Sequence, residues 1–212
     1  MNCRRAISIL VLGFSLLAKG QTQHRPAAAP PAKPAEGAQL YRNTTFGFRF
    51  QIPYGWVDRT RNMREQEVAG QPDPNRKASD IDKGEVLLAV FERPPEAAGE
   101  TINSAVVIAA ENAAAYPGLK KAEDYLGPLT ELTTSKGFKA EGDPSVIEID
   151  ARQLLRADFA KPLNDKLTMR QTTLVFLAHG QIVSFTFIAG SEDEVNDLVE
   201  ALSFGLTKSK AH

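Results

Sequence analysis

Residues 46–56 read Phe-Gly-Phe-Arg-Phe-Gln-Ile-Pro-Tyr-Gly-Trp, a pattern typical of a half-buried strand followed by a tight turn. Successive side chains of a strand point to opposite faces, so this alternation predicts one apolar face and one polar face. Pro53 removes a backbone donor and Gly55 allows a sharp bend, so we expect the strand to end at Ile52. Trp56 is the only tryptophan, and we expect it to pack back onto the core as an anchor.

More strands are predicted on both sides of this one. Leu40–Arg42 forms a short first strand, and residues 43–45 form the turn that follows it. Six further segments have the composition of strands: residues 85–92, 104–110, 146–150, 152–159, 167–178 and 181–189. His179-Gly180 is a tight turn signal that joins the last two as a hairpin. Strands joined by hairpins are antiparallel, so we expect an antiparallel sheet.

Two amphipathic helices are predicted to cover the sheet. The first ends at Gly137 and kinks at Gly127-Pro128, and its apolar face consists of Leu119, Ala122, Leu126, Leu129 and Leu132. The second begins with a capping box of Ser191 and Glu194 and stops at Gly205, and its apolar face consists of Val195, Leu198, Val199 and Leu202. The polar segment 59–84 is expected to be a surface loop, with a short helix near residues 62–68. This order of elements predicts an α+β fold, an antiparallel β-sheet flanked by helices.

The N-terminal residues are typical of an export signal. A basic start is followed by an apolar run too short to span a membrane, so we expect a signal peptide over residues 1–20, with cleavage near Gly20. Residues 21–39 are rich in Pro and Ala and predict a disordered linker before a domain over residues 40–206 and a flexible tail over 207–212. Cleavage would also remove Cys3, the single cysteine, so the mature chain would have no thiol. We expect an exported protein, periplasmic or secreted, with no stable membrane insertion after cleavage.

Three pieces of the sequence carry a resemblance to a known family. They are residues 41–56, residues 111–126 with Tyr116-Pro117-Gly118 before a helix, and residues 180–204 with a hairpin strand before a capped helix. In their order and spacing the chain resembles the PsbP-like family over roughly residues 40–206. The resemblance implies an α/β/α sandwich and a protein that docks onto other macromolecules, as the photosystem II subunit and the Ran-binding factor of that family do. The family shares no catalytic motif, so the resemblance assigns no functional residue.

The residues that usually carry chemistry are sparse and separated. The three histidines have no partner at the spacing of a metal site or a catalytic triad, and we expect His179 to be a turn residue. Asp80, Asp82 and Glu85 resemble a fragment of a calcium loop that Lys83 interrupts, so we expect a solvated loop there. Glu192, Asp193 and Glu194 fit the first turn of a helix, where negative charge is favourable. We therefore predict no catalytic residue, no metal site and no cofactor.

The most distinctive polar set consists of Arg49, Gln51, Arg59, Arg61 and Arg64. Arginine is common at interfaces because its planar fork pairs with carboxylates. We therefore predict a non-catalytic binding or assembly module that docks onto a protein through these residues. The formal net charge of −1 does not indicate a nucleic-acid-binding surface, and the sequence has no basic stripe, so we expect no nucleic-acid partner. The alternative is a small-ligand-binding protein or a carboxylate-based hydrolase, with Asp158 paired to Asp150 or Glu148.

Overall fold

The computed structural model of the chain describes residues 39–69, 84–97, 99 and 101–205. The predicted signal peptide, nearly all of the predicted linker, and the predicted tail lie outside the described residues. So do Asp80 and Asp82 of the calcium-loop fragment. The domain boundaries remain predictions, although the first strand already includes Gln39, which the sequence had assigned to the linker.

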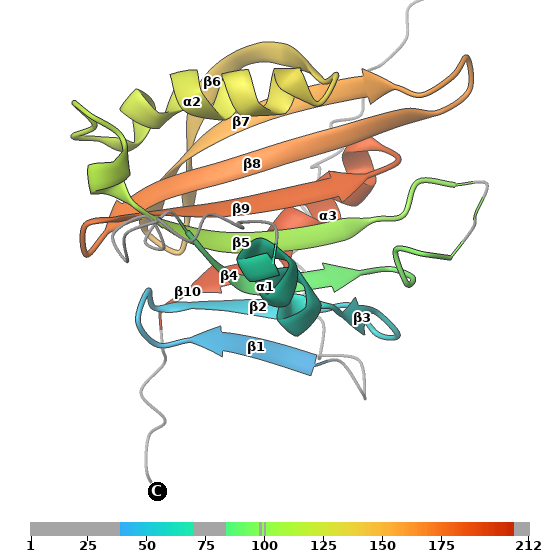
Figure 1. The fold of residues 1–212 in the computed structure, drawn as a ribbon, viewed down its shortest axis with the longest axis horizontal. Helices are drawn as coiled ribbons and strands as arrows, with labels where there is room; N and C mark the ends of the chain where they lie inside the picture. Colours follow the sequence, from blue (N-terminus) through green and yellow to red (C-terminus); the bar gives the residue numbers. More distant parts are fainter. Residues whose placement is uncertain (1–38, 70–83, 98, 100, 206–212) are drawn as a thin grey trace, which may run out of the picture. The chain divides into compact units, whose positions relative to one another are not determined.

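Two antiparallel sheets form the fold (Figure 1). The larger sheet has seven strands in the spatial order β3 (Val57–Asp58), β4 (Glu85–Phe91), β5 (Ala105–Asn112), β9 (Gln181–Ala189), β8 (Thr168–Ala178), β7 (Arg152–Pro162) and β6 (Lys139–Ile149). The smaller sheet has three strands in the order β1 (Gln39–Asn43), β2 (Phe48–Ile52) and β10 (Leu202–Phe204). The predicted α+β class with an antiparallel sheet is confirmed.

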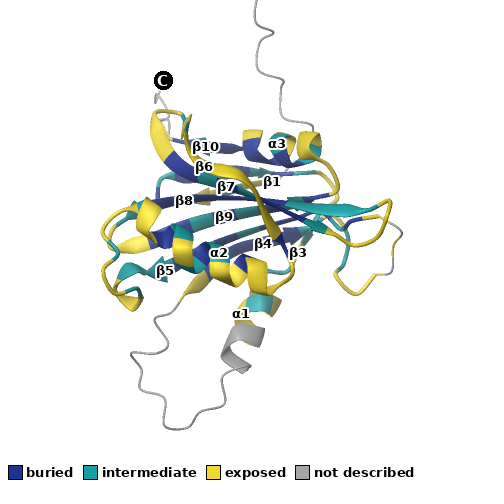
Figure 2. Cartoon of the chain, turned by 90° about the horizontal axis from the view of Figure 1, so that it is seen from above, coloured by how far each residue is buried: buried dark blue, intermediate teal, exposed yellow. Residues whose placement is uncertain are grey.

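Helices lie on both faces of the seven-stranded sheet. These are α1 (Thr60–Ala69), α2 (Leu126–Ser135) and α3 (Glu192–Glu200), with short 3-10 turns at Ala113–Ala115 (η2) and Ala122–Tyr125 (η3). Figure 2 shows α1 and α2 on one side of this sheet, and α3 and β10 on the other. The second layer therefore contains the three-stranded sheet as well as a helix.

The main core lies between the two sheets and is rich in aromatic side chains. The apolar positions of the alternating stretch, Phe48 and Phe50, are fully buried there, as the pattern predicted. They face Phe185 and Phe187 of β9, and the Phe48 and Phe185 rings meet edge to face at 4.9 Å between centroids. Such pairs stabilise a fold beyond their buried area. Trp56 is partly buried against this core, as expected of an anchor.

A second apolar cluster lies between the other face of the sheet and the segment η3–α2. Tyr125, Leu129, Phe138, Phe159 and Ile182 are its largest buried members. Leu132 was expected on the same face, but its side chain is 52% exposed. Because strand residues alternate, Leu154 belongs to the first cluster and its neighbour Leu155 to the second.

Two local predictions are reproduced in their detail. The β8–β9 hairpin turns at His179 and Gly180, whose φ angles are both positive, 53° and 73°. A two-residue turn needs such angles to match the right-handed twist of the two strands it joins. The predicted short helix near residues 62–68 is α1. Thr60 is its first residue, and the Asp58 carboxylate accepts the Thr60 N–H at 2.8 Å while the Thr60 hydroxyl accepts the Ala89 N–H of β4 at 2.9 Å.

The predicted kinked helix over residues 119–136 is wrong in its start. The chain forms the 3-10 turn η3 first, and α2 begins only at Leu126. Pro128 therefore lies in the first turn of α2, where a missing backbone N–H costs little, and it does not kink a longer helix.

The end of the last helix is also corrected. Helix α3 stops at Glu200, and Leu202–Phe204 is strand β10, paired antiparallel to β2. Leu202 is buried as predicted, but in a strand. The Ser191 hydroxyl caps α3 by accepting the Glu194 N–H at 3.2 Å. The Glu194 carboxylate accepts hydrogen bonds from the Gly190 N–H and from the hydroxyl of buried Ser104, the residue before β5. It therefore links α3 to the start of β5 and leaves the predicted box incomplete.

Strand β6 is longer than predicted. It begins at Lys139 and carries a register shift between Glu141 and Ser145 in its pairing with β7. Residues 139–145 are all exposed, so they lack the buried positions that gave the other strands their pattern. This strand forms the last edge of the seven-stranded sheet.

Candidate functional site

Two polar surfaces of the described domain are candidates for binding. The first is the outer face of the three-stranded sheet, which we call the arginine face. It consists of Leu40, Arg42, Arg49, Gln51 and Ser203, the residues that alternate with the core positions of β1, β2 and β10. The hairpin turn between β1 and β2 sets the register, in which Arg42 is directly opposite Arg49 and Leu40 opposite Gln51.

The two arginines form a like-charge pair. Ser203 of β10 is the neighbour of Arg49 on its other side, so neither adjacent strand supplies a carboxylate to it. Among the described residues, no acidic side chain lies within ion-pair distance of Arg42 or Arg49. The Nε of Arg49 is shielded from solvent and has no hydrogen-bond partner in the described part of the chain. Like charges directly opposite in a sheet are destabilising, so the fold does not require this pair.

The other three arginines of the predicted set are placed elsewhere. Arg61 and Arg64 lie on α1 and Arg59 just before it, beside the edge of the seven-stranded sheet. Each of them has a partner within the domain. Arg59 pairs with Glu96 at 3.1 Å, Arg61 with Glu65 at 2.8 Å, and Arg64 with Glu85 at 3.1 Å. Arg64 also donates to the Val86 carbonyl at 2.5 Å.

The five residues predicted as one docking set therefore divide into two groups. Only Arg49 and Gln51 share a strand face, and Arg42 joins them. The sequence contained a signal for Arg42, because a hairpin that pairs Asn43 with Phe48 also pairs Arg42 with Arg49. Whether any of these residues binds a partner remains a prediction.

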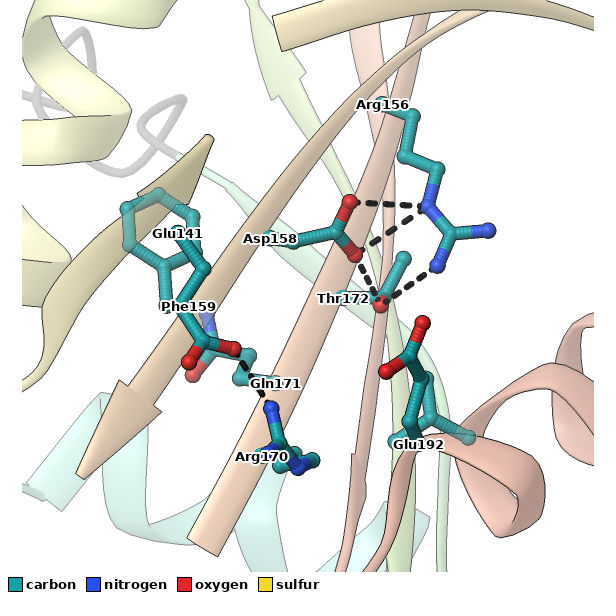
Figure 3. Close-up of a pocket in the computed structure, with 9 residues that line it drawn as sticks. Glu141, Arg156, Asp158, Phe159, Arg170, Gln171, Thr172 and Glu192 are labelled. Atoms are coloured by element: carbon teal, nitrogen blue, oxygen red, sulfur yellow. Dashed lines mark hydrogen bonds and ion pairs between the residues drawn. The ribbon is translucent and has the colours of Figure 1, made fainter. Parts of the chain in front are cut away.

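The second surface is a hollow of about 380 Å³ on the side of the sheet where α3 lies (Figure 3). Its walls come from β6, β7 and β8 and from the first turn and a half of α3. Five of its nine lining residues are charged, and the full set is Glu141, Arg156, Asp158, Phe159, Arg170, Gln171, Thr172, Glu192 and Val195. Val195 supplies a buried apolar side chain from α3, whereas Phe159 borders the hollow from β7 with its ring in the second apolar cluster on the other face of the sheet.

A network of ion pairs fixes the charged side chains of this hollow. Arg156 donates its Nε–H to both carboxylate oxygens of Asp158, at 2.9 and 3.1 Å. The Thr172 hydroxyl donates to Asp158 at 2.5 Å, and Asn196 of α3 accepts from Arg156 at 3.1 Å. Figure 3 shows Arg156, Asp158 and Thr172 converging from the neighbouring strands β7 and β8. The network holds the Asp158 carboxylate in one orientation, and neither Asp150 nor Glu148 takes part in it.

The predicted pairing of Asp158 with Asp150 or Glu148 is wrong. Asp150 lies in the β6–β7 turn with a φ of 47°, and its carboxylate accepts the Phe204 N–H at 3.0 Å. Asp158 is six residues beyond Arg152, the first residue of β7, which is roughly 20 Å along a strand, and Asp150 lies before that strand. Glu148 is opposite Gln153, and the residue across from Asp158 is Glu141. The carboxylates of that hypothesis are therefore too far apart to act on one bond.

A third polar cluster ties η3 to the sheet. The Glu111 carboxylate of β5 accepts hydrogen bonds from the hydroxyls of Tyr125, at 2.8 Å, and Tyr116. Burial, with the neighbouring Glu111 carboxylate, raises the pKa of Tyr116 to about 12. The same two causes, burial first, raise the pKa of the more deeply buried Tyr125 as well. Both phenols therefore stay neutral near pH 7. Their hydrogen bonds to Glu111 connect the segment before α2 to strand β5.

The remaining candidates from the sequence lie where they were expected. His179 occupies the hairpin tip, and Glu192, Asp193 and Glu194 form the first turn of α3. Over the described ranges, no three His, Cys, Asp or Glu side chains gather as a metal site would require. In the same part of the chain, none of the helices has the length and apolarity needed to cross a membrane.

Comparison with known proteins identifies fold relatives only. No family model matches the chain, and no curated protein matches its sequence. Among solved structures, a cyanobacterial PsbP from Synechocystis matches at 13% identity and a TM-score of 0.46, with 84% of this chain and 97% of that one covered. A Ran-binding protein of Saccharomyces cerevisiae matches at 11% identity and 0.41, with 77% and 83% covered. LpqN of Mycobacterium tuberculosis, described as involved in cell envelope biogenesis, matches at 12% and 0.36, with 81% and 87% covered.

The PsbP-like fold that the sequence resembles is thus among the solved structures that the chain matches. At these identities and TM-scores the likeness concerns the fold alone.

Proposed function

We propose that this protein is a non-catalytic, exported docking module that binds an acidic region of another protein through the arginine face. The observation that carries the proposal is the cross-strand pair of Arg42 and Arg49 on a sheet face where no described carboxylate compensates either charge. Export is inferred from the signal-like residues 1–20.

The chemistry of this face favours an acidic partner. Two adjacent guanidinium groups repel each other in the free protein and each offers a planar set of donors. A carboxylate placed between them would remove the repulsion and satisfy the shielded Nε of Arg49. Both effects exist only in the complex, so they favour binding without adding to the stability of the free domain.

The surroundings of the arginines suit a protein surface. Leu40, a member of this face, is 38% exposed and contributes apolar area, and Tyr54, which follows β2 in the chain, is 78% exposed. Tyrosine and arginine are the residues that most often dominate the energetics of protein interfaces. Arg59, Arg61 and Arg64 are already paired within the domain, so they do not form part of the proposed contact.

Site-specific photo-cross-linking in the cells that make the protein tests this assignment. A photoreactive amino acid replaces Gln51 on the arginine face in one version and the exposed Glu131 on α2 in the control version. We expect a discrete protein adduct from position 51 and none of the same size from position 131, with acidic residues in the cross-linked peptide of the partner. The same adduct from both positions, or a basic contact peptide, would overturn the proposal.

A further inference from the structure

The walls of the charged hollow in Figure 3 carry both signs of charge. The charges belong to two ion pairs and one additional carboxylate. Arg156 pairs with Asp158, and Arg170 pairs with Glu141 at 2.6 Å. Glu192 has no ion-pair or hydrogen-bond partner among the described residues. Its carboxylate points toward Thr172 and the Arg156 side chain in Figure 3. The hollow therefore contains one carboxylate without a partner in the described part of the chain, beside two guanidinium groups.

The guanidinium groups have donors left over after these pairings. The Nε and one terminal nitrogen of Arg156 are used by Asp158, Thr172 and Asn196, and one terminal nitrogen of Arg170 is used by Glu141. An arginine carries five N–H donors, so both side chains retain N–H groups without a described partner. Each side-chain nitrogen of Arg156 and Arg170 is either accessible to solvent or hydrogen-bonded, in contrast to the Nε of Arg49. The spare donors can therefore be reached by a ligand.

We propose that this hollow binds a small zwitterion, a molecule that carries an ammonium and a carboxylate close together, such as a free amino acid with an apolar side chain. The ammonium pairs with Glu192, the carboxylate takes the spare N–H donors of Arg156 and Arg170, and the apolar side chain contacts Val195 at the α3 wall. The volume of about 380 Å³ lies within the range of small-molecule sites. This site is separate from the arginine face and does not depend on the proposed function.

A zwitterion fits this site better than an ion of one sign. A simple anion would face Glu192, and a simple cation would face the two guanidinium groups, so each would meet an unfavourable charge. A zwitterion compensates both signs at once. The ion pairs of Arg156 and Asp158 and of Arg170 and Glu141 hold the arginines in place before the ligand arrives, which reduces the entropy lost on binding.

Calorimetric titration of the purified protein with three molecules of related shape tests the proposal. L-leucine has both charges, 3-methylbutylamine lacks the carboxylate, and 4-methylpentanoate lacks the ammonium. We expect binding of L-leucine at least about tenfold tighter than that of either single-charge compound, because each lost charge removes a charge-assisted hydrogen bond. Equal affinities for L-leucine and one single-charge compound, or no binding heat with L-leucine at millimolar concentration, would overturn it.

Two variants assign the binding to the hollow. Glu192→Gln should weaken L-leucine binding by about tenfold or more, because it removes the partner of the ammonium. Asp193→Asn makes the same charge change in the same turn of α3, and its exposed side chain does not line the hollow, so it should leave the affinity within twofold. The same loss in both variants would show an effect of charge at the helix start and would refute the site. Thermal unfolding of both variants checks that α3 is intact.

Discussion

Arg42 of β1 and Arg49 of β2 are directly opposite each other on the outer face of the three-stranded sheet. The pairing places two positive charges side by side, and no described residue of opposite charge lies near enough to compensate them. A fold selected for stability alone would place a neutral or acidic residue at one of these positions. The pair therefore favours a role in binding over a role in holding the domain together.

Replacement of Arg42 by Thr is expected to stabilise the domain by about 0.2–1 kcal/mol, because it removes the like-charge pair and introduces a residue that favours strands. Urea unfolding measures the change. The gain should shrink in high salt, where exposed charges are screened. Lys139→Thr on the exposed edge strand β6 is the control, since Ala160 is opposite it and no like charge is relieved. A loss of stability in Arg42→Thr would mean that the arginine makes a favourable contact.

The link between α3 and β5 predicts a large effect from a small deletion. The Ser104 side chain is 1% exposed, and its hydroxyl donates to the Glu194 carboxylate at 2.5 Å. Ser104→Ala should lower the free energy of unfolding by about 1–3 kcal/mol, because the carboxylate loses a buried donor. Ser191→Ala, which removes the helix cap of α3, should cost about 1 kcal/mol. Equal stability of Ser104→Ala and wild type would show that Glu194 finds water or another donor.

The tyrosine cluster predicts a loss of stability at alkaline pH. The folded-state pKa of Tyr116 is about 12, above its ordinary value near 10, so the unfolded chain releases this proton first as the pH rises. The stabilising contribution is complete below pH 10 and is lost between pH 10 and 12. Urea unfolding at several pH values measures this decline for the wild type.

Glu111→Gln should make that decline shallower. The amide removes the negative charge that helps to raise the pKa of both tyrosines, whereas the effect of burial remains. Absorbance of tyrosinate during a pH titration of the folded protein gives an independent reading. An identical pH dependence in wild type and Glu111→Gln would show that the carboxylate does not act on these phenols.

The packing between the sheets predicts that truncating two nearby aromatic residues, Phe48 and Tyr54, changes the free energy of unfolding by different amounts. Phe48 is fully buried against Phe185, so Phe48→Ala should cost about 3–5 kcal/mol in the free energy of unfolding. Tyr54 is 78% exposed, so Tyr54→Ala should change it by less than about 0.5 kcal/mol. Chemical denaturation of both variants makes the comparison. A small effect of Phe48→Ala would contradict the central place of this residue between the two sheets.

The sequence was most informative where the local pattern and the tertiary contacts agree. Alternation in Phe48–Ile52 and Gln181–Ala189 predicted buried strand faces because each strand packs one face on the core. His179-Gly180 predicted the hairpin because that turn needs two residues with positive φ. The same local reasoning failed for Leu202–Phe204, where Leu202 continues the helical spacing of α3 but pairing with the distant strand β2 decides the structure.

The residues of both candidate surfaces are brought together by the pairing register of the strands, which the sequence indicates only indirectly. The hollow brings Asp158, Thr172 and Glu192 together from β7, β8 and α3, and no spacing along the chain encodes their proximity. Exposed residues 139–145 lacked any buried alternation, so the true length of β6 was missed. The separation of Arg49 from Arg59, Arg61 and Arg64 follows from the path of the chain through β3 onto the edge of the larger sheet.

The most direct test of the docking proposal is the yield of the adduct cross-linked from position 51 in two charge-reversed variants, measured in the cells that make the protein. Arg49→Glu changes the arginine face, and Arg61→Glu makes the same charge change on the exposed surface of α1. We expect the adduct yield to fall at least about tenfold in Arg49→Glu and to stay within twofold of wild type in Arg61→Glu. Equal yields in the two variants, at equal protein levels, would contradict it.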